Sequence, residues 1–572
     1  MATDTADSAA VGQLIHWPDL SAYHIDLKLV AGDAIKSRPH RLLARGATEA
    51  YAEELSALGF ERRGGEWSRG TGGIGVRDLA DSVRKEFPEL RLTAVTRSAV
   101  VCADTDPLQV SYTTVGAHGG KPRLWLEGLR LGQAGFNRGE RYTVVMDPVR
   151  RSITLTHDAA GDRSVSGRTR AGRTPTPIID VASGDLNAIM SEGMRLQAVI
   201  RPGQIQFTLA PKEAAKHDRE ARLRQHVSVG LLTEGTLCAG AGVATQAVAE
   251  GFHNAGLRSS VEWIVDRERR YLEVAAENNR VVTGATRLFE ASLEELAPSL
   301  LPQVDVVQVS LPCTGHSVSG KAKRGLAVAE EHPTDALAIY GALRLIEAVQ
   351  PSVIISENVP LAASSASYAI FRAYLTEAGY KVFDKVMDET DAGSIEARSR
   401  WWFVAVSEGL AKGFDLENMP VIAKRFSTLG EVLEAIDDDD PAWARNEYLQ
   451  KKAARDLADG KGFRRQWVGP DSTTVGTIGR GYQKRRSTEP FVVRDDGMER
   501  LLTPAEHARV KGVPEELVRG VGVGLAHELL GQSILFGHGV LLGQRVAAHC
   551  QQIVAPNKTA QHKTAKPEGP KR

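Results

Sequence analysis

The stretch VGLLTEGTLCAGAGV, residues 229–243, decides the fold class of this chain. An apolar run leads into small residues and glycines, and a helix-forming sequence follows, as where a buried strand turns into a helix. Three similar apolar runs come later: VEWIVD at 261–266, VDVVQVSL at 304–311 and PSVIISENV at 351–359. Helical stretches separate them. This alternation predicts an α/β fold with a doubly wound, mostly parallel sheet.

The size and composition are those of a soluble protein with several domains. The chain has 572 residues and a mass of 61.8 kDa, enough for about three or four domains. Lysine and arginine total 71, as do aspartate and glutamate, and this balance excludes a histone-like nucleic-acid binder. Four scattered cysteines exclude a disulfide framework. Because we find neither a membrane-length apolar run nor a secretory signal, we expect a cytoplasmic protein with reduced thiols.

In folds of this kind, ligands bind at the carboxyl ends of the strands. The first apolar run ends in a loop whose candidate cofactor-binding residues are Cys238, Ala239, Gly240 and Gly242. The second run ends in Asp266, 24 positions after Gly242, where a carboxylate can accept hydrogen bonds from ribose hydroxyls. Judged without Asp266, the loop could also be a tight turn that binds no ligand. Since no P-loop motif occurs, the pattern favours a ribose-bearing ligand that needs no phosphate cradle, such as S-adenosylmethionine.

The third and fourth runs end in residues that can carry out chemistry. Pro312 and Cys313 follow the third run, where the rigid proline would hold the thiol at a cleft; a buried core thiol is the alternative. The fourth run ends in Glu357, which would project at the same sheet edge. Farther along, Arg398 and Arg400 share one face at the start of the strand WWFVAV and can hold a phosphate or a carboxylate. Taken alone, the glutamate and the arginines could equally be surface residues that face the solvent and have no part in a site.

The order of these motifs resembles that of the C5-type DNA cytosine methyltransferases. The resemblance covers 229–406 and resumes at 498–546, where RLLTPAE at 500–506, KGVP at 511–514 and the segment 531–540 match the family's last motifs. It implies the class I S-adenosylmethionine-dependent methyltransferase fold, S-adenosylmethionine as cofactor and no metal. It also implies a set of catalytic residues, Cys313, Glu357 and Arg398, and a set of cofactor-binding residues, Cys238, Ala239, Gly240, Gly242, Asp266 and Pro312.

The resemblance also implies a mechanism. The thiolate of Cys313 would add to C6 of a cytosine, so that C5 becomes able to attack a methyl group; cysteine suits this role because its thiol ionises near neutral pH. Glu357 would form a hydrogen bond at N3, and Arg398 would favour the thiolate. A base that the sequence does not identify then removes the C5 proton, and the sulfur leaves.

Several positions depart from the family's pattern. Thr314 stands where the family has glutamine, and Thr236 and Val243 replace an aspartate and a glycine of the cofactor loop. Glu396 replaces the glutamine that precedes the two arginines. The family's acidic residue near the adenine is expected around 288–289, where this chain has Leu-Phe. These departures concern contacts to cofactor and target, whereas the nucleophile, the acid and the arginines are kept.

The target base lies inside the duplex, so it must flip out of the stack before it can react. The loop 314–325 contains glycines, serines and basic residues, and we expect it to close over the flipped base. The region 416–496 is expected to recognise the DNA sequence. A solvated charged loop is the alternative for its basic cluster. The predicted nucleic-acid-binding residues are Arg400, Lys321, Lys323, Arg324, Arg480, Lys484, Arg485 and Arg486.

The residues before 226 are a mixture of short predicted strands and helices, rich in arginine and glycine, and contain no catalytic motif. At 125–156, and more weakly at 186–209, the sequence predicts a short helix, a strand, a turn and a second strand. This pattern resembles the small swapped-hairpin barrels of the AbrB and SymE-like proteins, many of which bind nucleic acid; an unrelated αβ accessory domain is the alternative. Two further helices are predicted at 48–58 and 77–87.

Six regions are therefore predicted along the chain. They are an αβ accessory region (1–110), a β-rich accessory domain (111–217), the catalytic cofactor-binding domain (226–415), the target-recognition region (416–496), the return to the catalytic domain (497–555) and a disordered basic tail (556–572).

The sequence thus predicts a cytoplasmic DNA (cytosine-5)-methyltransferase that acts on double-stranded DNA. The sequence leaves open whether the enzyme is paired with a restriction endonuclease or acts without one. Two other functions stay open. One is an RNA cytosine-5 methyltransferase, to which Thr314 points, and the other is a nucleic-acid-binding regulator with an inactive methyltransferase domain.

Overall fold

The computed structural model covers most of the chain from residue 107 onward. The described residues are 107–169, 175–312, 337–460 and 465–555, with Ser56 and five strands between residues 25 and 95. The predicted helix at 77–87, nearly all of that at 48–58 and the predicted tail at 556–572 lie outside them.

The chain forms two compact units, residues 1–213 and 214–572. Among the helices that the structure describes, none has both the length and the apolar character needed to cross a membrane.

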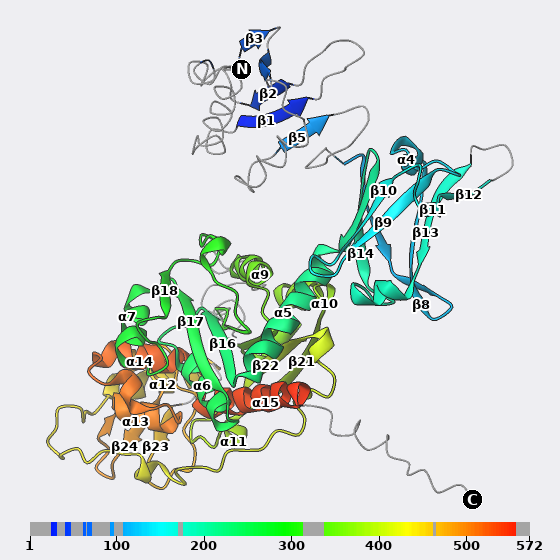
Figure 1. The fold of residues 1–572 in the computed structure, drawn as a ribbon. Coiled ribbons are helices and arrows are strands. Elements are labelled where there is room, and N and C mark those ends of the chain that lie inside the picture. The colour runs from blue at the N-terminus through cyan, green and yellow to red at the C-terminus, as the bar shows by residue number, and fades with distance from the viewer. Residues whose placement is uncertain are drawn as a thin grey trace, which may run out of the picture. The chain divides into compact units, whose positions relative to one another are not determined.

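The second unit is built on a seven-stranded sheet (Figure 1). Its strands occur in the order β18, β17, β16, β19, β20, β22, β21. Strand β22 runs in the opposite direction to the other six strands. The prediction of a doubly wound, mostly parallel sheet is therefore confirmed. The bounds are β16 (Leu231–Leu237), β17 (Arg258–Asp266), β18 (Arg287–Glu290), β19 (Val306–Val309), β20 (Val353–Asn358), β21 (Tyr380–Met387) and β22 (Arg400–Ser407).

Helices cover both faces of this sheet. One face packs against α6 and α15 and the other against α9 and α10, in two separate apolar clusters. The helices α6 and α15 approach closely because glycines lie at their contact. A Cβ on Gly251 would lie 2.3 Å from the carbonyl oxygen of Val540, and a Cβ on Gly543 would lie 2.2 Å from that of Val248. The bounds are α6 (Val243–Asn254), α7 (Arg269–Asn278), α9 (Ala338–Val349), α10 (Ala366–Glu377) and α15 (Phe536–Val554).

Helix α5 (Pro211–Ser228) is held against this unit by buried polar contacts. Arg219 is buried and donates to the two backbone carbonyls that precede β21, at 2.8 and 3.0 Å. Arg222 donates to the carbonyl oxygens of residues that precede β19 and β20. His226 Nδ1 lies 2.6 Å from the carboxylate of Asp305, at the start of β19. The carboxyl-terminal part of α5 is thus fixed to the sheet.

The region after β22 forms a smaller subdomain with its own apolar core. A three-stranded sheet and helix α12 make up most of its regular structure. Helices α13 and α14 then return the chain to the large sheet, and Arg500 and Glu506 form a buried, two-pronged ion pair at 2.7 Å where α13 begins. The bounds are α12 (Glu447–Ala458), β23 (Gln466–Val468), β24 (Pro490–Val493), β25 (Glu499–Arg500), α13 (Pro504–Val510) and α14 (Val523–Gln532).

The first unit contains an internal duplication. A hairpin, a short helix and a second hairpin occur twice, as β7-β8-α4-β9-β10 and as β12-β13-η2-β14-β15. Strands β8 and β13 pair with each other, as do β10 and β15, whereas β6 pairs with β14 and β11 with β9, so each half lends a strand to the other. The pattern predicted at 125–156 and 186–209 is present in both halves.

The strands of the first unit form three sheets, with the orders β11-β9-β10-β15-β14-β6, β12-β13-β8-β7 and β3-β4-β2-β1-β5. The bounds are β1 (Ile25–Val30), β2 (Arg41–Gly46), β3 (Glu61–Arg63), β4 (Glu66–Gly70), β5 (Leu92–Val95), β6 (Gln109–Thr114), β7 (Gly116–His118), β8 (Lys121–Glu127), α4 (Leu129–Gln133), β9 (Arg141–Asp147), β10 (Ser152–His157), β11 (Arg163–Ser164), β12 (Ser166–Arg168), β13 (Thr176–Ala182), η2 (Gly184–Ala188), β14 (Arg195–Arg201) and β15 (Gln204–Leu209).

Candidate active site

The loop between β16 and α6 is built from left-handed backbone conformations. Cys238, Gly240 and Gly242 have φ angles of 57°, 56° and 73°, and this conformation is uncommon for a residue with a side chain such as Cys238. The side-chain amide of Asn279 donates to the carbonyl oxygen of Gly242 at 2.8 Å, and a Cβ on Gly242 would lie 2.5 Å from that amide. The loop therefore requires glycine at 242. Cys238, Ala239 and Gly240 are partly exposed between a buried strand and a buried helix end.

Asp266 ends β17 directly beside this loop. Its carboxylate accepts a hydrogen bond from the Gly240 amide at 2.8 Å and another from the Glu268 amide at 2.9 Å. Burial raises the pKa of Asp266, although both amides act in the opposite direction. In the parallel register, Glu290 at the end of β18 lies next to Asp266. An exposed carboxylate thus stands beside the loop close to the predicted position 288–289. Sequence reasoning missed Glu290 because β18 has only four residues, and its pairing with β17 determines where it ends.

Strand β19 leads to Pro312, the last described residue before 337. The Ser310 amide donates to the carbonyl oxygen of Leu237 at 3.2 Å, which ties this strand end to the loop between β16 and α6, the predicted cofactor loop. The side-chain amide of Asn358 donates to the carbonyl oxygen of Leu311 at 3.1 Å. The backbone that leads to the predicted nucleophile is thereby fixed on two sides. Cys313 itself, the predicted lid 314–325 and its basic residues Lys321, Lys323 and Arg324 lie outside the described residues.

Glu357 forms an ion pair with Arg400 at the end of β20. The distance from Arg400 Nε to Glu357 Oε1 is 2.7 Å, and the two side chains are only 12% and 14% exposed. Because β22 runs antiparallel to β20, the start of β22 lies against the end of β20 and presents the arginine to the carboxylate. A well-desolvated pair of this kind holds both groups in one orientation. The acidic side chain therefore projects at the same sheet edge as Pro312 and the cofactor loop.

The other predicted arginine, Arg398, serves a different set of contacts. Its guanidinium is buried and donates to the carbonyl oxygens of Ile478 and Gly531 and to Glu396, each at 3.2 Å. Glu396 also accepts from Lys511 Nζ at 2.7 Å. Burial would raise the pKa of Glu396, but Lys511 and Arg398 outweigh it and hold that pKa below its usual value. A glutamate in place of the family's glutamine is thus compensated by a buried lysine.

The family model for C-5 cytosine-specific DNA methylases matches residues 235–537, more than half of the chain. The chain belongs to this family. Its strand order, with a single reversed strand near one edge, is accordingly that of the class I S-adenosylmethionine-dependent methyltransferases.

Curated relatives support the assignment. The chain is 28% identical over 249 residues to the type II methyltransferase M.MspI of Moraxella sp., a match that covers 42% of this chain and 56% of the relative. It is 27% identical to M.NlaX of Neisseria lactamica, over 41% of this chain and 73% of the relative. The match thus spans little more than half of the M.MspI chain. A solved Dnmt2 methyltransferase of S. pombe is 18% identical, with a TM-score of 0.44 over 55% of this chain and 98% of that chain.

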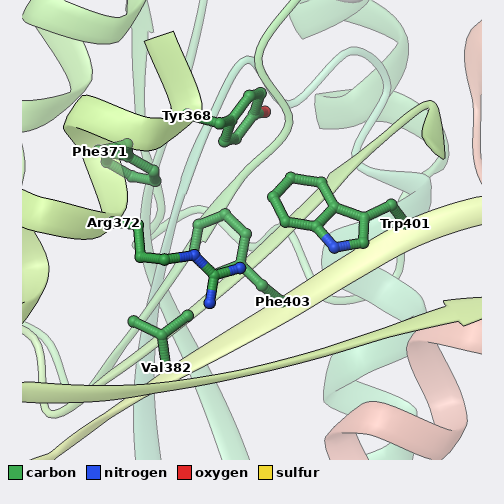
Figure 2. A pocket seen from close by; sticks show the side chains of 6 residues that line it. All are labelled: Tyr368, Phe371, Arg372, Val382, Trp401 and Phe403. Atoms are coloured by element: carbon green, nitrogen blue, oxygen red, sulfur yellow. The ribbon is translucent and has the colours of Figure 1, made fainter. Parts of the chain in front are cut away.

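Aromatic side chains support the strand ends of this methylase domain (Figure 2). The ring centroids of Tyr368 and Trp401 are 5.1 Å apart, and the Tyr368 hydroxyl accepts a hydrogen bond from Asn358. Trp401 adjoins Arg400 in sequence, so this packing also fixes the start of β22. A shallow hollow among these rings is too small to hold a water molecule and is not a cofactor site. It is lined by Tyr368, Phe371, Arg372, Val382, Trp401 and Phe403.

The basic residues predicted to bind DNA occupy different surroundings. Lys484 is exposed, and the guanidinium of Arg486 lies over Gly481. Arg485 donates to the carbonyl oxygen of Ala442 at 3.2 Å, within the smaller subdomain that follows β22 and was predicted to recognise the DNA sequence. Arg480 instead forms hydrogen bonds with Glu528 of α14 and with Tyr271 of α7.

Proposed function

We propose that this protein transfers a methyl group from S-adenosylmethionine to C5 of a cytosine in double-stranded DNA. The observation that carries the proposal is the partly buried ion pair of Glu357 and Arg400, at the same sheet edge as the cofactor loop and the strand that leads to Cys313. Membership of the cytosine methylase family supports it, as do relatives named as type II methyltransferases.

The residues around the loop fit the proposed cofactor. Gly240 is partly exposed, and nothing lies closer than 3.7 Å to the position of a Cβ there, so a ligand can approach its backbone. Asp266 ends β17, where its carboxylate can accept hydrogen bonds from ribose hydroxyls, and Glu290 ends the adjacent strand, where its carboxylate can accept one from the adenine amino group. Pro312 would line the side of the cofactor site opposite these carboxylates. When bound, S-adenosylmethionine would supply an electrophilic methyl group.

The chain's own residues would activate the base. The Cys313 thiolate adds to C6 of the flipped cytosine, and this bond places an electron pair at C5. Glu357, held in place by Arg400, takes part as the protonated acid: it gives its proton to N3 as charge develops there, and it takes the proton back when the C6–S bond breaks. After the methyl group is attached, a base removes the C5 proton and the C6–S bond breaks. We assign the support of Glu357 to Arg400. Arg398, which the resemblance implies as the cation that favours the thiolate, donates instead to Glu396 and to two backbone carbonyls, so we assign it no part in these steps.

Methyl transfer from labelled S-adenosylmethionine to duplex DNA and to tRNA tests this proposal. We expect label in DNA, and no incorporation with Cys313→Ser. Cys102→Ser, outside the family match, is the matched control and should keep activity. Incorporation into RNA alone would favour the RNA alternative. Binding of DNA by the wild-type protein without any methyl transfer would favour a regulator with an inactive domain.

The covalent step can be tested separately. A DNA duplex with 5-fluorocytosine at the target cannot lose a proton from C5, so the C6–S bond should persist and survive denaturing electrophoresis. The wild-type protein should form this adduct and Cys313→Ser should not. Bisulfite-type sequencing of host DNA with and without the gene would identify the modified base and the target sequence, and no modified cytosine would contradict the proposal.

A further inference from the structure

A segment of the recognition subdomain, residues 475–480, is fixed inside the methylase domain. Val475 forms backbone hydrogen bonds with Ile395 and Ala397, at 3.0 and 2.7 Å. The Ile478 amide donates to Glu396 at 3.1 Å. A Cβ on Gly531 would lie 2.3 Å from the carbonyl oxygen of residue 479, so the segment packs directly on the start of the family's last motif. These contacts determine where Arg480, the last residue of the segment, can lie.

Arg480 binds two residues of the methylase domain. Its Nε donates to Glu528 Oε1 at 2.9 Å and its Nη2 donates to the Tyr271 hydroxyl at 2.8 Å. The Tyr271 hydroxyl in turn donates to Glu528 at 2.6 Å. Burial would raise the pKa of Glu528, but the hydrogen bonds from Tyr271 and Arg480 outweigh it and keep that pKa below its usual value. The three side chains therefore form one charged network, centred on an ionised carboxylate.

This network adjoins the cofactor loop. Tyr271 packs in one apolar cluster with Ala241 of the loop and with α14. The side chain of Gln532, at the end of α14, lies near enough to the Tyr271 hydroxyl to act against the rise that burial causes in the pKa of Tyr271, and its amide nitrogen lies 3.7 Å from the position of a Cβ on Gly240. Contacts thus run without interruption from Arg480 in the recognition subdomain to the loop backbone.

We propose that Arg480 is a positioning residue of the cofactor site, which links the recognition subdomain to that site, and that it does not bind DNA. This inference rests on the proposed function, because it takes the loop to be the S-adenosylmethionine site. Arg480 acts through Tyr271, Glu528 and Gln532, which it orients beside the loop. By linkage, DNA bound to the recognition subdomain and cofactor bound at the loop then raise each other's affinity.

Calorimetric titration with S-adenosylhomocysteine, which cannot donate a methyl group, tests the proposal with and without duplex DNA. Arg480→Ala should weaken cofactor binding roughly tenfold, because a charge-assisted hydrogen bond is lost. Arg480→Lys should recover part of this loss. In steady-state assays, Arg480→Ala should raise the KM for S-adenosylmethionine more than it lowers kcat. The stimulation of cofactor binding by DNA should also disappear.

Lys484→Ala is the matched control, since Lys484 is a nearby exposed basic residue. It should weaken DNA binding and leave cofactor affinity unchanged, which is the reverse of the effect of Arg480→Ala. Unchanged cofactor affinity in Arg480→Ala, with reduced DNA affinity, would overturn the inference but not the proposed function. Failure of the wild-type protein to bind S-adenosylhomocysteine would overturn both. If Arg480→Ala does not fold, Glu528→Gln keeps the Tyr271 contact and should weaken cofactor binding in the same way.

Discussion

At the residue scale, two arginines separated by a single serine have different roles. Arg400 is the first residue of β22, where the antiparallel pairing with β20 brings it to Glu357. Arg398 precedes the strand, and its side chain enters the contact between the recognition subdomain and the last motif. The i, i+2 spacing predicts a common face only within an extended strand. The boundary of β22 therefore determines which arginine supports the acid.

Replacement of Arg400 should impair chemistry more than binding. Arg400→Ala leaves Glu357 without its guanidinium partner, so single-turnover methylation should slow by about 10²-fold or more. Cofactor affinity, measured by calorimetry, should change little. Arg372→Ala is the control, because Arg372 forms a more exposed ion pair with Asp384. An equal slowing in both variants would contradict the assignment.

Buried histidines should make the methylase domain sensitive to acid. His538 Nε2 donates to the carbonyl oxygen of Asp388 at 2.7 Å, and burial lowers its pKa to about 4. In the unfolded chain this histidine titrates near pH 6.5, so the unfolded state gains a proton first as the pH falls. Stability that is fully present above about pH 6.5 should therefore be lost between about pH 6.5 and 4, by at most about 3 kcal/mol from this residue.

Thermal melts across this pH range test the effect. His538→Gln should flatten the decline in melting temperature on acidification, whereas His253→Gln, at an exposed position, should leave it unchanged. Identical pH profiles for wild type and His538→Gln would show that another group dominates the acid sensitivity.

At the element scale, the contact between α6 and α15 depends on glycine. Backbone carbonyls of each helix occupy the positions that side chains would need at Gly251 and Gly543. This close packing holds α15, the last helix among the described residues, against the helix that starts at the cofactor loop. The last motif can therefore return to the loop although about 300 residues separate the two in sequence.

A methyl group at this contact should be costly. Gly543→Ala would place a Cβ 2.2 Å from a carbonyl oxygen of α6 and force the helices apart. We expect a loss of about 1–3 kcal/mol in the free energy of unfolding, measured with denaturant. Gly284→Ala is the control, because no atom lies within 4 Å of the added methyl group. Similar stabilities of the two variants would mean that the helices separate at little cost.

At the scale of the whole molecule, α5 belongs to the methylase unit. Arg219, Arg222 and His226 fix it to residues that begin or precede three strands of the large sheet. The carboxylate of Asp305 accepts hydrogen bonds from His226 and from both the amide and the hydroxyl of Thr233. A helix that supplies so many partners to buried groups contributes to stability of that unit.

Truncation should reveal this dependence. A chain of residues 211–572 keeps all of α5 and should fold and bind S-adenosylhomocysteine, whereas residues 229–572 leave Asp305 without His226 and Arg222. We expect the shorter chain to melt at a temperature several degrees lower, since a loss of about 1 kcal/mol shifts the melting point by roughly 2–4 °C in domains of this size or somewhat smaller. Equal melting temperatures would show that the contacts of α5 add nothing to stability.

The sequence by itself determined the fold class, the order of the motifs and the residues at or just after the ends of β16, β17, β19 and β20. These features depend on local patterns, because an apolar run followed by glycine or by a polar residue is visible within a few positions. The repeated helix–strand–turn–strand pattern of the first unit was visible for the same reason.

Only the tertiary structure decided which of these residues meet. The pairing of Glu357 with Arg400, the place of Glu290 beside Asp266 and the contact of Arg480 with Tyr271 and Glu528 join residues from separate strands and helices. The packing of residues 475–480 on the methylase domain fixes the third of these contacts. Strand register and the direction of the one reversed strand fix the other two. Both are set by packing across the whole sheet, so neither can be derived from neighbouring residues in the chain.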